Sequence, residues 1–293
     1  MEGILLVDKP AGPTSHDVVA RLRRVLGTRE MGHAGTLDPQ ATGLLVLAVG
    51  RATRWLPYLP TAKSYRATLR LGLSTDTEDI WGAALPPDDG PAPLPDAAAV
   101  RRALEGLTRL KTQVPPMVSA VKRDGRRLYE LAREGLSVER AGRPVRVDAV
   151  RVLAVRGADA DFEVDCGPGT YVRTLCVEAG RSLGQQACMA ALRRLACGGF
   201  TLERALPEER WTPEALAAGL LGSASALGHL PERALDAAEA EAVGHGRPVG
   251  IGGAALAATW RLTREGRLLA FAQEGPDGSL RPTRVFAETH APV

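Results

Sequence analysis

A strict alternation of apolar and polar side chains over residues 63–72 constrains the fold more than any other feature. Tyr65, Ala67 and Leu69 fall on one face, and Arg66 and Thr68 fall on the other. A two-residue period is typical of a β-strand with one buried and one wet face. Two short apolar runs, residues 3–7 and 44–49, predict further strands with both faces buried. The chain is therefore expected to contain a sheet with at least one covered face.

Helical periodicity interrupts these strands. Thr14 and Ser15 are good N-cap residues before an apolar stripe that runs to Gly27. A second stripe begins at Val172 and recurs at helical spacing to Leu183. We also expect helices over residues 97–107 and 185–196, largely helical chain over 202–226, and a short helix near 128–133. These patterns predict an α+β unit with helices flanking the sheet.

The end of the chain has a different pattern. Residues 232–243 predict a helix, and residues 259–262, 267–273 and 279–286 predict strands joined by Gly-containing turns. A chain of 293 residues, 45% hydrophobic, has room for two domains. We therefore expect a domain junction near residue 226 and a small C-terminal β-barrel.

Charge and cysteine content limit the classes of protein to which the chain can belong. The net charge is only +3, but residues 1–70 carry 10 basic and 5 acidic side chains, and residues 111–200 carry 15 and 10. Two basic blocks give weak support for a nucleic-acid partner. The four cysteines contain no C-x-x-C pair, so we expect buried reduced thiols and no metal site. No apolar stretch is long enough to span a bilayer, so we expect a cytoplasmic protein without a membrane contact.

The strongest functional signal is the loop over residues 32–43, Gly-His-Ala-Gly-Thr-Leu-Asp-Pro-Gln-Ala-Thr-Gly. Asp38 is preceded by Leu37, followed by Pro39 and enclosed by glycines, so it is a candidate nucleophile or base on a fixed turn. The residues alone equally allow Asp38 to be a turn-capping residue. A carboxylate among apolar residues also needs an adjacent cation to stay charged.

An ordered set of motifs resembles the bacterial TruB-type tRNA pseudouridine-55 synthases over nearly the whole chain. The set comprises residues 3–10 with 14–17, the loop 32–43, Lys63-Ser64-Tyr65, residues 75–79 with Gly82, residues 115–122 and residues 169–175. The resemblance implies a pseudouridine-synthase-like mixed, mostly antiparallel sheet with flanking helices, and a small C-terminal PUA-like β-barrel. It divides the chain into a catalytic domain, 1–226, with an inserted arm at about 111–144, and a PUA-like RNA-binding domain, 227–293.

The same resemblance implies three catalytic residues. Asp38 corresponds to the family's catalytic aspartate, Arg173 to the arginine that pairs with it, and Tyr65 to the aromatic residue that stacks on the target uracil. From the residues alone, Tyr65 is interpreted as a core tyrosine. Arg173 could be a solvated helix residue, but it follows the Gly-Pro-Gly-Thr turn and lies one position off the apolar stripe, so we favour the ion pair. Extrusion of the target base requires apolar and aromatic groups that replace its lost stacking.

Further residues are expected to contact the RNA. By resemblance, the substrate-binding set is Lys9, Pro10, His33, Gly35, Thr36, Asp79, Lys122, Tyr171 and Leu192. The basic blocks supply the expected phosphate contacts, namely Lys9, Arg21, Arg23, Arg24, Arg51, Arg54, Lys122, Arg123, Arg126 and Arg127. Such a set predicts salt-sensitive binding of a folded RNA that is recognised by its shape and its unstacked loop bases.

The implied function is isomerisation of a specific uridine to pseudouridine in the T loop of tRNA, by base flipping and aspartate-dependent rearrangement of the glycosidic bond. The expected partner is the tRNA T-arm, with no cofactor, no metal and no protein partner, and the expected state is a monomer.

Three alternatives stay open. The first is a tRNA-folding chaperone activity independent of catalysis. The second is another carboxylate enzyme, such as a glycosidase, with Asp76 or Asp79 as its general acid. The third is a guide-RNA-dependent relative, although the basic terminal extensions expected for that role are missing from the sequence.

Overall fold

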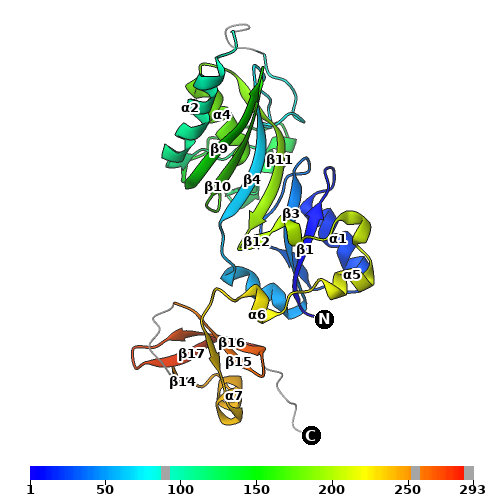
Figure 1. Ribbon diagram of the computed structural model, residues 1–293, viewed down its shortest axis with the longest axis vertical. Helices are drawn as coiled ribbons and strands as arrows, with labels where there is room; N and C mark the ends of the chain where they lie inside the picture. Colours follow the sequence, from blue (N-terminus) through cyan, green and yellow to red (C-terminus); the bar gives the residue numbers. More distant parts are fainter. Residues whose placement is uncertain (87–92, 252–257, 287–293) are drawn as a thin grey trace.

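The computed structural model describes residues 1–86, 93–251 and 258–286, which form two main sheets (Figure 1). The larger sheet has eight strands, in the order β1-β3-β11-β4-β10-β9, with β2 paired to β3 and β12 paired to β11. Its strands are β1 (Gly3–Lys9), β2 (Met31–His33), β3 (Thr42–Val49), β4 (Lys63–Leu71), β9 (Val147–Arg156), β10 (Asp159–Cys166), β11 (Ala187–Cys197) and β12 (Phe200–Thr201).

The predicted mixed, mostly antiparallel sheet is confirmed. Every pairing among these strands is antiparallel except that of β11 with β3, which is parallel. The predicted alternation is present in β4, where Tyr65, Ala67 and Leu69 are buried. The apolar run in β1 is buried on both faces, because Ile4 and Leu5 pack into different hydrophobic clusters.

Helices cover both ends of this sheet. α2 (Ala97–Gly106) and α4 (Val172–Ser182) pack against β9, β10, β4 and β11, and α1 (Ser15–Leu26) and α5 (Pro213–Ala218) pack near β1 and β3 (Figure 1). α1 begins where the sequence predicts, because Thr14 accepts a hydrogen bond from the Asp17 backbone N–H and Asp17 returns one. It ends at Gly27, whose φ of 61° favours glycine.

Two helix predictions are wrong. Residues 185–196 fall mostly within β11, because β4 and β3 pair with this segment from either side. Residues 202–226 are broken into short pieces rather than one helical stretch. These pieces are the 3₁₀ turns Leu202–Arg204 and Glu208–Arg210, then α5 and α6 (Ser223–Ala226). A longer 3₁₀ helix, Gly50–Tyr58, follows β3.

The arm contains the predicted short helix, α3 (Leu128–Arg133). A two-residue hairpin, β6 (Lys122–Arg123) with β7 (Arg126–Arg127), precedes it. The base of the arm is formed by β5 (Thr112–Gln113) and β8 (Arg143–Pro144), which pair with each other.

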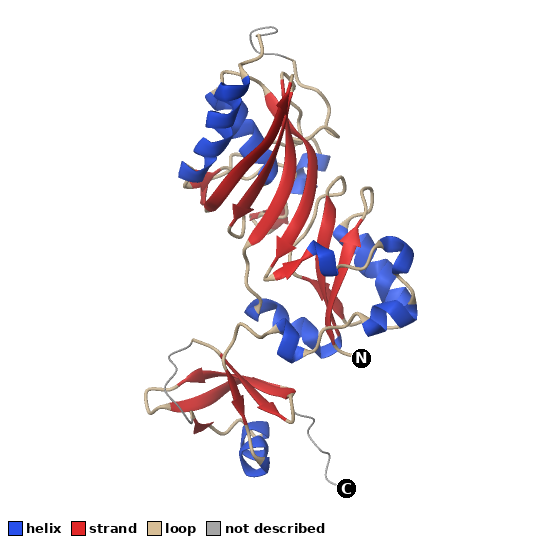
Figure 2. Cartoon of the chain, in the orientation of Figure 1, coloured by secondary structure: helices blue, strands red, loops and turns tan. Residues whose placement is uncertain are grey.

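The smaller sheet belongs to the C-terminal part of the chain (Figure 2). Its order is β13-β15-β16-β17-β14, and its elements are β13 (Glu232–Ala234), α7 (Ala237–Gly244), β14 (Val249–Gly250), β15 (Trp260–Arg264), β16 (Arg267–Glu274) and β17 (Ser279–Val285). The three predicted strands are present. The predicted helix begins only at Ala237, because the first residues of the predicted range form β13. The predicted closed barrel is not observed among the described residues, which form a half-barrel sheet.

Aromatic stacking joins the smaller sheet to the 3₁₀ helix that follows β3. The Tyr58 ring stacks on the Phe271 ring, with centroids 3.7 Å apart, and Phe286 contacts Phe271 edge-on. Phe271 belongs to the same buried cluster as Ile4 and Trp55. The C-terminal sheet therefore shares a hydrophobic core with the larger unit.

Candidate active site

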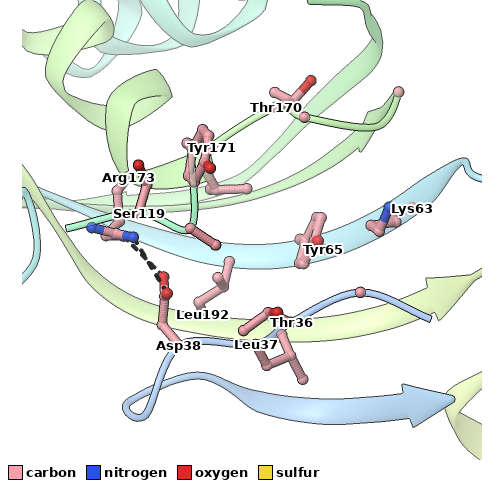
Figure 3. A pocket seen from close by; sticks show the side chains of 15 residues that line it. Thr36, Leu37, Asp38, Lys63, Tyr65, Ser119, Thr170, Tyr171, Arg173 and Leu192 are labelled. Atoms are coloured by element: carbon pink, nitrogen blue, oxygen red, sulfur yellow. Dashed lines mark hydrogen bonds and ion pairs between the residues drawn. The ribbon is translucent and has the colours of Figure 1, made fainter. Parts of the chain in front are cut away.

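A cavity of about 260 Å³ opens between the loop that precedes β3, the strands β4 and β11, and the start of α4 (Figure 3). The predicted site residues that line it are Gly35, Thr36, Asp38, Tyr65, Tyr171, Arg173 and Leu192. These residues come from four separate segments of the chain. The sheet therefore brings together seven of the twelve predicted site residues around one cavity.

The predicted ion pair between Asp38 and Arg173 is present. Arg173 Nε donates to Asp38 Oδ2 at 2.9 Å, and Arg173 Nη2 donates to Asp38 Oδ1 at 3.3 Å. The guanidinium also donates to the backbone carbonyls of Thr77 and Val118, each at 2.8 Å. Arg173 is thus a buried cation whose donors are shared between a carboxylate and two loops.

Hydrogen bonds on both sides of Asp38 fix its loop. The Ser15 hydroxyl accepts from the Leu37 N–H at 2.8 Å, and the Gly12 N–H donates to the Pro39 carbonyl at 2.8 Å. Because Ser15 begins α1, the turn that carries the carboxylate is attached to a capped helix. These contacts hold the Asp38 turn in one position.

Lys9 lies beside the loop that carries Asp38. Its side chain has no exposed surface, and Nζ donates to the carbonyls of Pro10, Pro39 and Ala41 at 2.8–3.1 Å. Burial lowers the pKa of Lys9 to about 8, against the attraction of the Asp38 carboxylate. The Lys9 ammonium is therefore enclosed by backbone carbonyls, which is not the exposed position expected of a phosphate-contacting lysine. Pro10 contributes its carbonyl to this enclosure.

Arg194 was not predicted as a functional residue. It is fully buried and donates to the carbonyls of Leu44 at 2.7 Å, Gly35 at 3.1 Å and Thr36 at 3.3 Å. The guanidinium thus supports the loop that carries Asp38 from β11. In the sequence, Arg194 is only the second residue of an Arg-Arg pair, and such a pair looks the same whether it is exposed or buried.

Tyr65 and Leu192 line the cavity from adjacent strands. Tyr65 is 7% exposed and Leu192 is 9% exposed, so each presents a small apolar surface to the cavity. Burial raises the pKa of the Tyr65 hydroxyl to about 12, although the nearby Arg194 guanidinium opposes the shift. The hydroxyl is therefore protonated at neutral pH and is able to donate a hydrogen bond.

The carboxylates of Asp76 and Asp79 accept hydrogen bonds from their own loop. Asp76 Oδ1 accepts from the Ala83 N–H at 2.8 Å, and Asp79 Oδ1 accepts from the Thr77 hydroxyl at 2.9 Å and the Trp81 N–H at 3.0 Å. Asp79 lies 4.0 Å from Arg173 Nε, and burial raises the pKa of its carboxyl. These contacts favour a turn-stabilising role over that of a glycosidase acid.

A second cavity of about 790 Å³ adjoins the first, because Thr36, Asp38 and Ser119 line both. His16 lines it from α1, and side chains of the arm such as Tyr129 and Leu136 close its far side. His33 lies on β2, where its ring meets that of His16 edge-on at 5.6 Å. Burial, together with the neighbouring His16, lowers the pKa of His33. The two cavities form a continuous recess between the arm and the loop that carries Asp38.

The proposed phosphate contacts fall into two groups. Lys122, Arg123 and Arg126 are exposed on the hairpin of the arm. In the other block, Arg21 pairs with Glu208, and the Arg23 guanidinium donates to the Met31 carbonyl at 2.7 Å. On the hairpin, Arg123 pairs with Asp124 and Arg126 pairs with Glu134. Both basic blocks therefore carry exposed cations that also have acidic partners.

The four cysteines are buried free thiols, as predicted. Among the described residues, no three His, Cys, Asp or Glu side chains are grouped so that they could hold a metal ion. Within residues 1–86, 93–251 and 258–286, no helix has the length and apolar character needed to cross a bilayer.

Comparison with known proteins gives consistent results. Residues 23–172 match the family described as "TruB family pseudouridylate synthase (N terminal domain)". The chain is 49% identical to the tRNA pseudouridine synthase B of Mycobacteroides abscessus, over 86% of this chain and 85% of that protein. It is 44% identical to the protein of the same name from Thermobifida fusca, over 98% of this chain and 99% of that protein.

The fold agrees with these matches. A solved structure described as a Cbf5-Nop10-Gar1 complex superposes with a TM-score of 0.74 at 26% identity, covering 97% of this chain and 85% of the matched chain. The family match covers the segments that carry Asp38, Tyr65 and the arm, and it ends one residue before Arg173. With a shared fold and a shared ordered set of motifs, the chain belongs to the TruB family of pseudouridylate synthases.

Proposed function

We propose that this chain converts one uridine in the T loop of tRNA to pseudouridine, with Asp38 as the essential carboxylate. The observation that carries the proposal is the Asp38–Arg173 pair at the wall of a cavity that Tyr65 and Leu192 also line. A flipped uracil in this cavity would stack on Tyr65, with its ribose toward Asp38. The names of the relatives, tRNA pseudouridine synthase B, support tRNA as the substrate.

The chemistry matches this arrangement. The N1–C1′ bond of uridine breaks, a C5–C1′ bond forms, C5 loses its proton and N1 gains one, so the atoms balance within the nucleoside. The step needs a carboxylate at the sugar and a site that retains the detached base. Arg173 holds the Asp38 carboxylate by two hydrogen bonds, and the enclosing walls at Tyr65 and Leu192 hold the uracil while it rotates.

Binding of the RNA is assigned to the surface around the cavity. Extrusion of the base requires groups that occupy the vacated space in the loop, and His33 beside the second cavity is placed for that role. Gly35, Thr36 and Tyr171 would contact the flipped nucleotide, and Lys122 would contact a phosphate of the T-arm. Asp79 would act through Arg173, which lies beside it.

The domain assignment is part of the same proposal. Residues 1–226 would form the catalytic domain, with its arm at about 111–144, and residues 227–293 would form a PUA-like RNA-binding domain. The half-barrel sheet and its shared core with the catalytic unit support a fixed position for this second domain. A monomeric, cytoplasmic enzyme that needs no protein partner agrees with modification of free tRNA.

The deciding experiment is tritium release from a tRNA transcript labelled at uridine C5. Wild type is compared with Asp38→Asn, and the assay is repeated with the target T-loop uridine replaced by cytidine. We expect release that requires both Asp38 and that uridine, with a loss of at least about 1,000-fold in the variant. Tight RNA binding without release by wild type would instead support the chaperone alternative.

A further inference from the structure

The base of the arm contains a buried glutamine whose side chain binds another backbone. Gln113, on β5, is 4% exposed. Its Nε2 donates to the Tyr171 carbonyl at 3.0 Å, and its Oε1 accepts from the Tyr171 N–H at 2.8 Å. The side-chain amide thus satisfies both backbone groups of one residue, as a neighbouring β-strand would.

Tyr171 is the residue through which this contact reaches the active site. It is the N-cap of α4, where its side chain makes no capping hydrogen bond, and its ring lines the cavity. The Tyr171 carbonyl also accepts the helical hydrogen bond from Leu175 at 3.1 Å. Since Arg173 lies in the first turn of α4, the amide of Gln113 fixes the helix start that carries the catalytic arginine.

A second contact joins the arm to the same arginine. The carbonyl of Val118, five residues beyond Gln113, accepts from Arg173 Nη2 at 2.8 Å. The arm therefore holds Arg173 at two points, through the backbone at Tyr171 and through the guanidinium itself. Among the described arm residues, Gln113 alone binds both the backbone N–H and the backbone carbonyl of a residue that lines the cavity.

We propose that Gln113 is a positioning residue for uridine isomerisation, which sets the orientation of Arg173 toward Asp38 by clamping the backbone of Tyr171. The inference rests on the proposed function. Because Gln113 is buried behind the cavity wall, it acts on the reacting groups and not on the RNA. A displacement of about 1 Å in a catalytic group lowers rates by about 100-fold.

The test compares Gln113→Met with Gln113→Glu. Methionine keeps the length of the side chain and removes both hydrogen bonds, whereas glutamate keeps the acceptor but places a second acceptor against the Tyr171 carbonyl. Gln185→Met is the matched control, because Gln185 also donates to a backbone carbonyl, that of Pro93, but away from the cavity. Single-turnover tritium release and the tRNA Kd are measured for each variant.

We expect both Gln113 variants to lose about 10- to 100-fold in the single-turnover rate while the Kd stays within about twofold. Gln185→Met should match wild type in both quantities. A near-wild-type rate in a folded Gln113→Met protein would overturn the inference. A parallel loss of rate and affinity would also overturn it, because it would assign Gln113 to RNA binding.

A double-mutant cycle with Arg173→Met separates positioning from general destabilisation. If Gln113 acts through Arg173, adding Gln113→Met to Arg173→Met should change the rate by less than about twofold. Multiplication of the two losses would contradict the proposal. Absence of release by wild type would mean that the proposed function fails, whereas an active wild type with an equally active Gln113→Met variant means that only this inference fails.

Discussion

Arg173, whose side chain is 3% exposed, holds the carboxylate of Asp38, whose side chain is 33% exposed, across 135 positions of sequence. The arginine is the fixed member of the pair, since two backbone carbonyls also bind it. The aspartate keeps an accessible surface toward the cavity. An ion pair built in this way fixes the position of the carboxylate without closing it off from the cavity.

Arg173→Met should lose far more turnover than RNA affinity. The substitution removes the cation beside Asp38 and leaves the Thr77 and Val118 carbonyls without their donor. We expect the single-turnover rate to fall by at least about 100-fold and the tRNA Kd to change by less than about threefold. Tritium release and filter binding measure the two quantities. Turnover near that of wild type would refute the role of the ion pair.

RNA binding should weaken with salt in proportion to the phosphates contacted. Replacing Lys122 and Arg123 by alanine should make the slope of log K against log salt shallower by about 1.5 to 2. Arg151→Ala with Arg156→Ala is the control, because these arginines are exposed on the edge strand β9, outside the arm. An unchanged slope in the arm variant would exclude the hairpin as a phosphate-binding surface.

Gly43→Ala should destabilise the protein by about 2–4 kcal/mol. Gly43 has a φ of +101°, and a Cβ there would lie 2.4 Å from the Arg194 carbonyl oxygen. The clash falls where β3 pairs in parallel with β11, so no flexible side chain can move aside. Urea denaturation measures the loss. Gly222→Ala, where a Cβ meets nothing within 4 Å, should stay within about 0.5 kcal/mol of wild type.

Stability should decline in alkali because buried acids must stay protonated in the folded chain. Burial raises the pKa of the Cys166 thiol to about 11, from 9.0 for an exposed thiol. Between pH 9 and 11 the unfolded chain loses this proton first, so it binds fewer protons than the folded chain. The free energy of unfolding then falls by about 1.4 kcal/mol per pH unit for this group.

Urea denaturation at pH 8 to 11 measures the free energy of unfolding of wild type and of Cys166→Ala. The variant should show a slope that is shallower by about 1.4 kcal/mol per pH unit over pH 9–11. Tyr65 contributes with the same sign at higher pH, because burial raises its pKa to about 12. Identical slopes in the two proteins would contradict the assignment to Cys166.

Local sequence patterns predicted correctly those helices and strands whose tertiary contacts favour the same structure as the pattern does. β4 alternates because one face packs against α4 and the other is wet, and α1 begins at Thr14 because the cap is local. Residues 185–196 show the opposite case. Their alanine, leucine and arginine content favours a helix, but backbone pairing with β4 and β3 makes them a strand.

The site residues also divide into those that sequence motifs identify and those whose contacts depend on distant segments. Asp38 and Arg173 were predicted because their motifs identify them, and the sheet brings them within hydrogen-bonding distance. Lys9 and Arg194 could not be separated from exposed cations, since burial of a charge depends on carbonyls supplied by distant segments. Gln113 carries no local signal, because its partner Tyr171 lies 58 positions away.

The parallel pairing of β3 with β11 has a consequence for synthesis of the protein. A ribosome makes the Asp38 loop early, but the strand that supports it through Arg194 appears more than 150 residues later. Non-local pairings of this kind form only when both partners are present. A nascent chain would therefore carry Asp38 in an unsupported loop until β11 leaves the exit tunnel, so that the cavity is complete only after most of the polypeptide has been made.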